Sequence, residues 1–166
     1  RRNKKRKSQE RGKEVIYVIG DSNGMIGDTT GRSEKRKNQT TQEVKKKAKT
    51  YLAQVYKILD KDKTTVAYNS EWMNKFSSVE MIELAAHYTV ARMLERDDFQ
   101  KRLAQNLPVS IHELMYPLIQ GYDSVALKSD IELGGTDQKF NLLVGRDLHR
   151  AYGHKPQIVL TQPLLE

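Results

Sequence analysis

Three polar side chains, Tyr116, Gln120 and Asp123, follow one another at intervals of four and three residues. In a helix this spacing places a phenol, an amide and a carboxylate on one face. Such groups are costly to bury unless each finds a hydrogen-bond partner. A polar, amphiphilic small molecule bound against the helix would supply those partners. A helix that presents a polar stripe at an interface is the other interpretation, and spacing alone leaves both open.

Glycine-rich segments follow two short apolar runs. The first begins at Gly20, after the run Val15–Ile19, and contains Asp28. Glycines at the end of a strand let the backbone approach a ligand closely. This segment lacks both the Gly-Lys-Ser/Thr ending of a Walker loop and the G-x-G-x-x-G pattern. Alone it is weak support for a site, because Asp28 could equally be a turn residue or a helix N-cap.

The second glycine segment reads Gly134-Gly135-Thr136-Asp137-Gln138. It lies where a short apolar run gives way to a helical pattern. One interpretation is a glycine turn in which Thr136 or Asp137 caps the helix. The other is a binding loop, because the N-terminus of a helix favours negatively charged ligand groups.

The hydrophobic pattern predicts the elements that position these residues. We expect strands over 15–19, 65–68, 130–133 and 157–161, and helices over 40–59, 77–85, 90–95, 97–106, 110 onward and 136–152. Thr40, Ser77 and Ser110 each begin a capping-box pattern, whereas Pro117 indicates that its helix begins late or bends. Strands that alternate with helices predict an α/β fold with a parallel sheet and helices on both faces. Ligands of such sheets lie beyond the carboxyl ends of the strands, where both glycine segments fall.

Composition limits the class of protein. The 166 residues are 37% hydrophobic and 30% charged, which suits one polar α/β domain. No apolar run is long enough to cross a membrane, and no secretory signal pattern is present. The chain has no cysteine, so disulfides and thiolate metal sites are excluded, which fits the cytoplasm. Its four histidines show no metal-ligand spacing, so no metal site is predicted.

Positive charge is concentrated in two segments. The net charge is +8, and residues 1–13 and 32–49 each hold eight Arg or Lys. Basic patches of this kind can bind nucleic acid by releasing counterions. Neither patch contains the interleaved aromatic residues that stack on unpaired bases. A solvated surface is therefore the simpler interpretation, and a nucleic-acid-binding domain remains an alternative.

The strings YPLIQGYDSVAL and ELGGTDQKFNLLVGR closely resemble the catalytic domain of bacterial tyrosyl-tRNA synthetases, which are class I aminoacyl-tRNA synthetases. The resemblance runs from about residue 12 to 166 and implies a Rossmann-like fold. It implies that Asp28, Tyr116, Gln120, Asp123 and Gln138 bind L-tyrosine, with Asp123 meeting the phenol hydroxyl. A buried carboxylate that bonds a phenol would reject phenylalanine, which would leave it unpaired.

The same resemblance implies an adenylate side to the site. Gly20, Asp21, Gly134, Gly135 and Asp137 would lie against ATP, which arrives with Mg²⁺, and Asp137 would accept a ribose hydroxyl. No residue is predicted to act as a nucleophile, acid or base, because the family activates tyrosine by positioning the reactants. L-Tyrosine, ATP and tRNA are thus the partners that the resemblance implies.

The domain organisation expected from the resemblance is a single partial catalytic domain over residues 1–166. Residues 70–108 would be a helical insertion that also forms a homodimer contact, and residues 1–13 a basic N-terminal segment. The family's His-x-Gly-His and Lys-Met-Ser-Lys-Ser signatures are not among these 166 residues. They stabilise the triphosphate in the activation transition state, so we expect tyrosine recognition with slow or absent activation.

The departures from the family pattern make the chain more polar. Residues 1–11 are polar where the family has an apolar helix, and Ser22-Asn23 replaces Phe-Thr. Asn23 stands at a substrate-binding position, so affinity could be reduced. We interpret the chain as an excised and resurfaced fragment of the catalytic domain, with an unusual natural sequence as the competing explanation. The alternative function is a non-catalytic engineered or dimerising scaffold.

Overall fold

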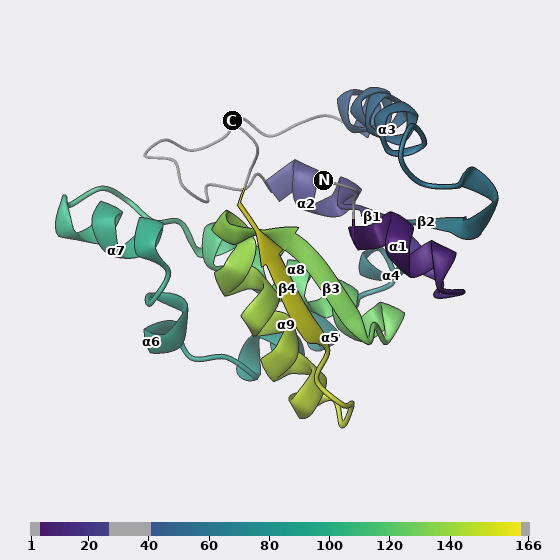
Figure 1. Cartoon of the computed structure of the whole chain (residues 1–166). Coiled ribbons are helices and arrows are strands. Elements are labelled where there is room, and N and C mark those ends of the chain that lie inside the picture. Colours follow the sequence, from purple (N-terminus) through teal and green to yellow (C-terminus); the bar gives the residue numbers. More distant parts are fainter. Residues whose placement is uncertain (1–3, 27–40, 164–166) are drawn as a thin grey trace.

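The structure, a computed structural model, describes residues 4–26 and 41–163 of the chain (Figure 1). Along these ranges the elements are α1 (Lys4–Glu10), β1 (Val15–Ile19), α2 (Asp21–Ile26), α3 (Thr41–Val55), η1 (Lys61–Lys63), β2 (Thr64–Tyr68), α4 (Ser70–Met73), α5 (Ser78–Ala86), α6 (Val90–Met93), α7 (Asp97–Ala104), α8 (Ile111–Leu127), β3 (Ile131–Gly135), η2 (Thr136–Gln138), α9 (Lys139–Ala151) and β4 (Ile158–Gln162). The predicted α/β class with parallel strands is confirmed. None of the helices in the described ranges is long and apolar enough to cross a membrane.

The four described strands form two parallel pairs. β1 pairs with β2, with Val15 opposite Thr64, and β3 pairs with β4, with Ile131 opposite Ile158. We expected one sheet, but the described strands make two separate two-stranded sheets. The difference arises because no described strand lies between β1 and β3 to connect the two pairs.

Helices α8 and α9 cover one face of the β3–β4 pair (Figure 1). Glycines allow the two helices to approach closely: a Cβ added at Gly121 would lie 2.9 Å from the backbone nitrogen of Gly145. A Cβ added at Gly145 would in turn meet the side-chain amide of Gln157 at 2.9 Å. The same helix pair contributes to the main apolar core, whose buried members are Leu84, Met93, Phe99, Leu118, Val125, Val144 and Leu148.

The opposite face of the β3–β4 pair is not covered by described residues. Alternate strand residues point to opposite faces, and Glu132 points to α8, where its carboxylate accepts a hydrogen bond from Ser124. Ile131 and Leu133 therefore point away from α8, together with Ile158 and Leu160 of β4. Ile131 is 53% exposed and Ile158 is 56% exposed. This sheet thus has helices on one face only within the described chain.

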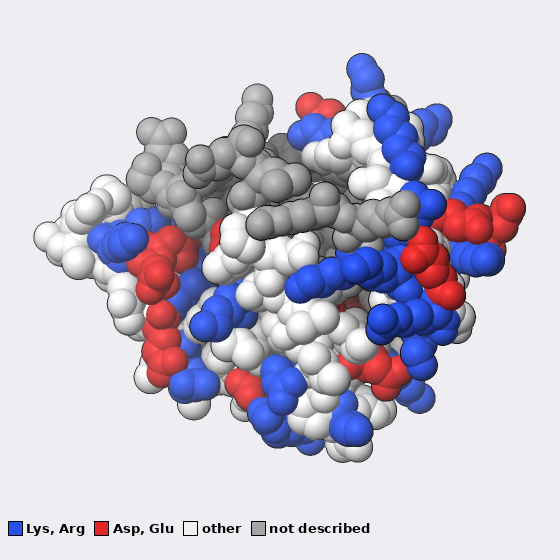
Figure 2. Space-filling model, in the orientation of Figure 1, with Lys and Arg blue, Asp and Glu red and all other residues white. Residues whose placement is uncertain are grey.

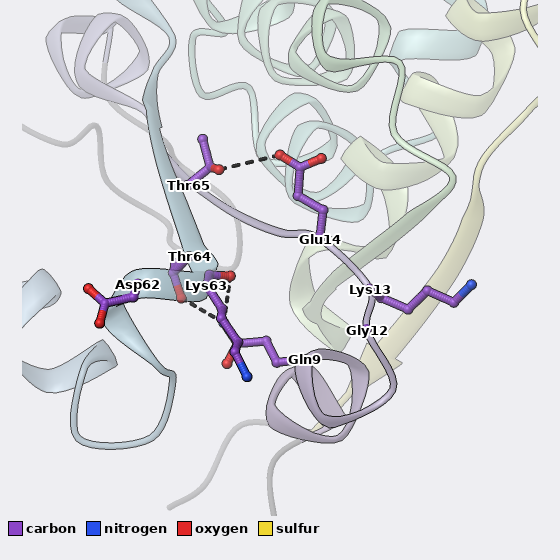
Figure 3. A pocket seen from close by; sticks show the side chains of 8 residues that line it. All are labelled: Gln9, Gly12, Lys13, Glu14, Asp62, Lys63, Thr64 and Thr65. Carbon is purple, nitrogen blue, oxygen red and sulfur yellow. Dashed lines mark hydrogen bonds between the residues drawn. The ribbon is translucent and has the colours of Figure 1, made fainter.

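The basic segment at the N-terminus contains helix α1, which is attached to the start of β2. The side-chain amide of Gln9 is buried and donates to the Lys63 carbonyl and the Thr64 hydroxyl, both at 2.8 Å. The residues around these contacts, shown in Figure 3, line a hollow of about 420 Å³. The hydrophilic side of α1 is solvated, and Figure 2 shows Lys and Arg side chains gathered over the side of the molecule that carries α1 and α3.

Residues 70–108 contain four of the helices, α4 to α7. The capping box predicted at Ser77 is confirmed, because its hydroxyl accepts from the Glu80 N–H and the Glu80 carboxylate accepts from the Ser77 N–H. An ion pair attaches this region to α8: Arg102 Nη1 lies 2.5 Å from Glu113 Oε2. Whether residues 70–108 form a separate insertion stays a prediction.

Several boundaries differ from the sequence-based expectation. Asp21–Ile26 is helical although we predicted no helix in this glycine-rich segment, and Gly134 and Gly135 continue β3 although a turn was one interpretation. Helix α8 begins at Ile111 and runs through Pro117 to Leu127. The helix expected from residue 136 begins with the 3-10 turn η2. The capping box expected at Thr40 lies outside the described residues.

Candidate functional site

The polar face of α8 opens onto a cavity of about 900 Å³ between β1 and β3. Tyr116, Gln120 and Asp123 all line it, as the helical spacing predicts. Gln138, from the turn after β3, and Gly20, from the end of β1, lie on the same cavity. The structure therefore brings together residues from three separate stretches of sequence that were each singled out as binding candidates.

Asp123 is the most constrained group of the site. It is 8% exposed. The indole Nε1 of Trp72 donates to Oδ1 at 2.9 Å, and the Asn69 side-chain amide lies 3.3 and 3.4 Å from the two carboxylate oxygens. Burial raises the pKa of Asp123 from 3.8 to about 7, although the bonds from Trp72 and Asn69 lower it. The carboxyl group can thus be held in either protonation state near neutral pH, as an acceptor or a donor.

Sequence reasoning missed Trp72 and Asn69. Both follow the carboxyl end of β2, the region where ligands of parallel sheets bind. That signal was present, since Asn69 comes directly after the strand, but β2 carried no glycine motif to draw attention to it. Asn69 also donates to Asn23 Oδ1 at 2.7 Å, so Asn23 is tied to the Asp123 network.

A second group of polar contacts lies around Gln138. Its Oε1 accepts from the amides of Asn141 at 3.2 Å and Gln120 at 3.3 Å. Asn141 also donates to Gln120 Oε1 at 2.9 Å, and Asn141 is buried. Three amides on α8, η2 and α9 thus form one cluster that can offer both donors and acceptors to a polar ligand. Asn141 is a member that sequence reasoning did not identify.

The residues expected on the adenylate side are less closely grouped. Among the described residues, the lining of the cavity includes Gly20 but not Asp21, Gly134, Gly135 or Asp137. The Asp21 carboxylate accepts from the Ser70 N–H at 2.9 Å and the Ser70 hydroxyl at 2.6 Å, which joins α2 to α4. Asp137 is exposed and accepts a hydrogen bond at 3.0 Å from Gln138, which lines the cavity.

Gly134 has a packing reason to be glycine. A Cβ added there would lie 2.8 Å from Leu142 Cδ1 of α9. Close packing of Leu142 of α9 against β3 therefore favours glycine here independently of any ligand. Asp28, the remaining candidate for tyrosine binding, lies outside the described residues. No cluster of His, Asp or Glu in the described ranges has the arrangement of a metal site.

The raised pKa of Asp123 predicts that stability decreases as pH rises. Between about pH 4 and 7 the folded chain keeps a proton that the unfolded chain has released. This stabilising contribution is complete below the unfolded pKa and is lost as pH passes through about 7. We expect the free energy of unfolding to fall by up to about 1.4 kcal/mol per pH unit relative to Asp123→Asn. Denaturant unfolding of both proteins across this range tests the prediction, and parallel pH profiles would contradict it.

Comparison of the sequence with known proteins identifies its family and its relatives. The sequence matches the family of class I tRNA synthetases (W and Y) over residues 2–166. The tyrosine–tRNA ligase of Geobacter sulfurreducens is 64% identical over 98% of this chain, and that of Legionella pneumophila (strain Lens) is 60% identical over 99%. These matches cover 40% and 41% of the two relatives, so the chain spans about two fifths of their length.

Solved structures show the same fold. A C-terminally truncated mitochondrial tyrosyl-tRNA synthetase from Aspergillus nidulans aligns with a TM-score of 0.78 at 23% identity, over 93% of this chain and 52% of that protein. A tyrosyl-tRNA synthetase from Archaeoglobus fulgidus, in complex with L-tyrosine, aligns with a TM-score of 0.67 at 22% identity, over 95% of this chain and 47% of that protein.

Proposed function

The chain belongs to the class I tRNA synthetase family (W and Y), and from that premise we propose that its cavity recognises L-tyrosine. The chain would be the amino-acid-recognition part of a tyrosine–tRNA ligase. The observation that carries the proposal is the buried carboxyl group of Asp123 at the wall of the cavity. A buried carboxyl group is stabilised by every further hydrogen bond it receives or makes. The phenol hydroxyl of tyrosine would make such a bond, and phenylalanine could not.

The rest of the cavity suits the remainder of an amino acid. Tyr116 and Gln120 lie on the same face of α8 as Asp123, about two turns and one turn nearer its start, respectively. We propose that they hold the ammonium group, with Asp28 as a further partner. Gln138 would contact the tyrosine from the side of β3. The amide cluster of Gln120, Gln138 and Asn141 supports this assignment, because its members hold one another in place.

In the complete protein the tyrosine carboxylate would attack the α-phosphate of ATP in line and displace pyrophosphate. The tyrosyl group would then pass from the adenylate to a hydroxyl of tRNA, with release of AMP. The adenylate would lie near Gly20, Gly134, Gly135 and Asp137, at the carboxyl ends of β1 and β3. Exposed Asp137 is available to a ribose hydroxyl. Because both Asp21 oxygens accept bonds from α2 and α4, Asp21 would contribute through its backbone. Mg²⁺ would bind together with ATP. The protein would act in the cytoplasm.

Titration of the chain with L-tyrosine, and separately with L-phenylalanine, tests the proposal. Trp72 is the single tryptophan of the chain and bonds to Asp123, so its fluorescence reports on the carboxyl group directly. We expect a saturable change with tyrosine and none with phenylalanine at the same concentration, with calorimetry as a second readout. A folded protein that binds neither amino acid would overturn the proposal and favour the scaffold alternative.

We also propose that residues 70–108 contribute to a homodimer. Val79, Ile82 and Val90 are each more than 60% exposed. Exposed apolar groups that lie near one another are typical of protein interfaces. We expect Ile82→Arg to shift the sedimentation of the chain from dimer to monomer, whereas Glu83→Arg, on the neighbouring exposed position, should have a smaller effect. A chain that is monomeric at all concentrations would contradict the prediction.

A further inference from the structure

The first turns of α8 carry Tyr116 and are held less firmly by their own backbone than the rest of the helix. In a helix, each N–H bonds the carbonyl four residues earlier. Pro117 has no N–H, so the carbonyl of Glu113 lacks the bond that residue 117 would otherwise supply. The residues before Pro117 therefore depend more on contacts from outside the backbone of α8 for their position.

The side chain of Glu113 makes such contacts. Its Oε2 accepts a hydrogen bond from Arg102 Nη1 at 2.5 Å. Its Oε1 accepts from Arg102 Nη2 at 3.2 Å and from the Ser110 N–H at 3.0 Å. Both side chains are buried, with 2% of Glu113 and 8% of Arg102 exposed. One carboxylate thus bonds the guanidinium of an arginine on α7 and the backbone just before α8.

Arg102 also fixes the loop that joins α7 to α8. Its Nη2 donates to the Pro108 carbonyl, and its own carbonyl accepts from the N–H groups of Gln105 at 3.1 Å and Leu107 at 2.8 Å. The donors of a guanidinium lie in one rigid plane, so these bonds hold the loop in a defined geometry. A shift of this guanidinium would move the loop and the start of α8 together.

Arg102 is itself firmly anchored on the side of α7. Asp98, one turn earlier on the same helix, is buried and accepts from Arg96 Nε at 2.5 Å and Nη2 at 2.6 Å. The Arg96 guanidinium lies 4.1 Å from the ring centroid of Phe99, which is fully buried in the apolar core. The hydrogen bond to Glu113 raises the pKa of Arg102, as does the charge of Asp98, although burial opposes both. Four buried charges of alternating sign therefore connect the core of residues 70–108 to α8.

We propose that Arg102 and Glu113 are positioning residues that fix where Tyr116 lies in the cavity and, through it, the affinity for the ammonium group of tyrosine. The second half of this statement rests on the proposed function. Glu113 precedes Tyr116 by three residues, so the bonded carboxylate and the phenol that lines the cavity lie within one helical turn. Helix α7 thereby contributes to the site although it does not line the cavity.

The phenol end of the site has a separate support. Asp123 lies beyond Pro117 on α8 and is held by bonds from Trp72 and Asn69. Neither residue belongs to the contacts around Arg102. A displacement of the start of α8 should therefore alter the ammonium end of the site and leave the phenol end as it is.

Arg102→Lys tests the proposal in a protein that keeps a positive charge opposite Glu113, whereas Glu113→Leu would report mainly on stability. Lysine has no planar fork, so it cannot bond both carboxylate oxygens and the Pro108 carbonyl in the same geometry. Arg92→Lys is the matched control. Arg92 also pairs with a glutamate within residues 70–108, but that pair is exposed and does not contact α8.

Hydrogen exchange of the ligand-free protein, followed by NMR, measures how firmly the start of α8 is held. In Arg102→Lys we expect the amides of Met115 and Tyr116 to exchange at least about tenfold faster, and in Arg92→Lys to be unchanged. The amides of Asp123 and Ser124 should be unchanged in both variants. Faster exchange along the whole of α8 would mean that the pair only stabilises the fold, and would overturn the proposal, as would unchanged exchange throughout.

A second measurement compares L-tyrosine with 3-(4-hydroxyphenyl)propanoate, which is tyrosine without its ammonium group. In Arg102→Lys we expect the affinity for L-tyrosine to fall by about tenfold, as for the loss of one hydrogen bond to a charged group. The affinity for the propanoate should be unchanged, and equal losses for the two ligands would overturn the assignment to the ammonium end. A wild-type chain that binds neither ligand would refute the proposed function, and the exchange result would then decide alone whether the pair positions Tyr116.

Discussion

Replacement of Asp123 by alanine is expected to weaken L-tyrosine binding by about tenfold to a hundredfold. The substitution removes the proposed partner of the phenol hydroxyl. It also leaves the Trp72 indole and the Asn69 amide without the acceptor that holds them at the cavity wall. Calorimetric titration measures the affinity, and circular dichroism establishes that the variant is folded.

Two further variants separate recognition from structural support. Asp123→Asn keeps one acceptor oxygen for Trp72 and should lose less affinity than alanine. Trp72→Phe removes one bond to the carboxylate without removing the carboxylate itself. Because that bond lowers the pKa of Asp123, its loss should move the pH dependence of tyrosine binding to higher pH. Tyrosine affinity that is unchanged in a folded Asp123→Ala protein would contradict the assignment of Asp123.

Replacement of Glu113 by leucine is expected to lower the free energy of unfolding by about 3–5 kcal/mol. The Glu113 side chain is 2% exposed and its carboxylate bonds both the Arg102 guanidinium and the Ser110 N–H. Without it, the charge of Arg102 stays buried with no counter-charge at this position. Denaturant unfolding followed by fluorescence measures the loss.

Two controls make this prediction specific. Arg92 and Glu95 form an exposed pair at 2.8 Å, so Glu95→Leu should have a much smaller effect than Glu113→Leu. A double variant, Arg102→Met with Glu113→Leu, should recover much of the loss, because it removes the uncompensated charge. If Glu113→Leu and Glu95→Leu cost the same, the buried pair would not have the assigned role.

Acid should weaken the same contact. Burial alone would raise the pKa of Glu113, but the hydrogen bonds from Arg102 and Ser110 hold it at about 2. A lowered pKa stabilises the fold above the ordinary pKa of the group and loses this contribution as pH falls through the folded value. The dependence has the opposite sign to that of Asp123, whose contribution is lost as pH rises.

The sequence pattern predicted the elements that repeat a simple period. The continuous apolar run Val15–Ile19 is β1, and the polar stripe on α8 lines the cavity as its spacing indicates. These predictions succeeded because they depend on local geometry. The predicted parallel strands are present, and the family that the two long strings indicate is the one that the sequence matches.

The features that the sequence pattern did not predict depend on contacts between segments that are distant in the chain. Asp21 was singled out as a nucleotide contact, but the pattern could not predict the bonds of its oxygens to Ser70, which lies far along the chain. Gly134 looked like a turn residue, whereas the approach of Leu142 explains it within a strand. Trp72 reaches Asp123 only because the fold brings α4 to α8. Periodicity contains no information on such pairings, nor on the separation of the four strands into two pairs.

The contact between Gly121 and Gly145 has an evolutionary consequence. Neither glycine reaches the cavity, yet together they set how far α8 stands from α9, and so the distance from Gln120 to Asn141. A selection experiment that demands tyrosine binding should therefore retain glycine at both positions as strictly as it retains the residues that touch the ligand. A substitution at Gly145 should come with a smaller side chain at Gln157, whose amide lies 2.9 Å from the added Cβ. A substitution at Gly121 meets the backbone nitrogen of Gly145 at 2.9 Å, which no change of side chain relieves.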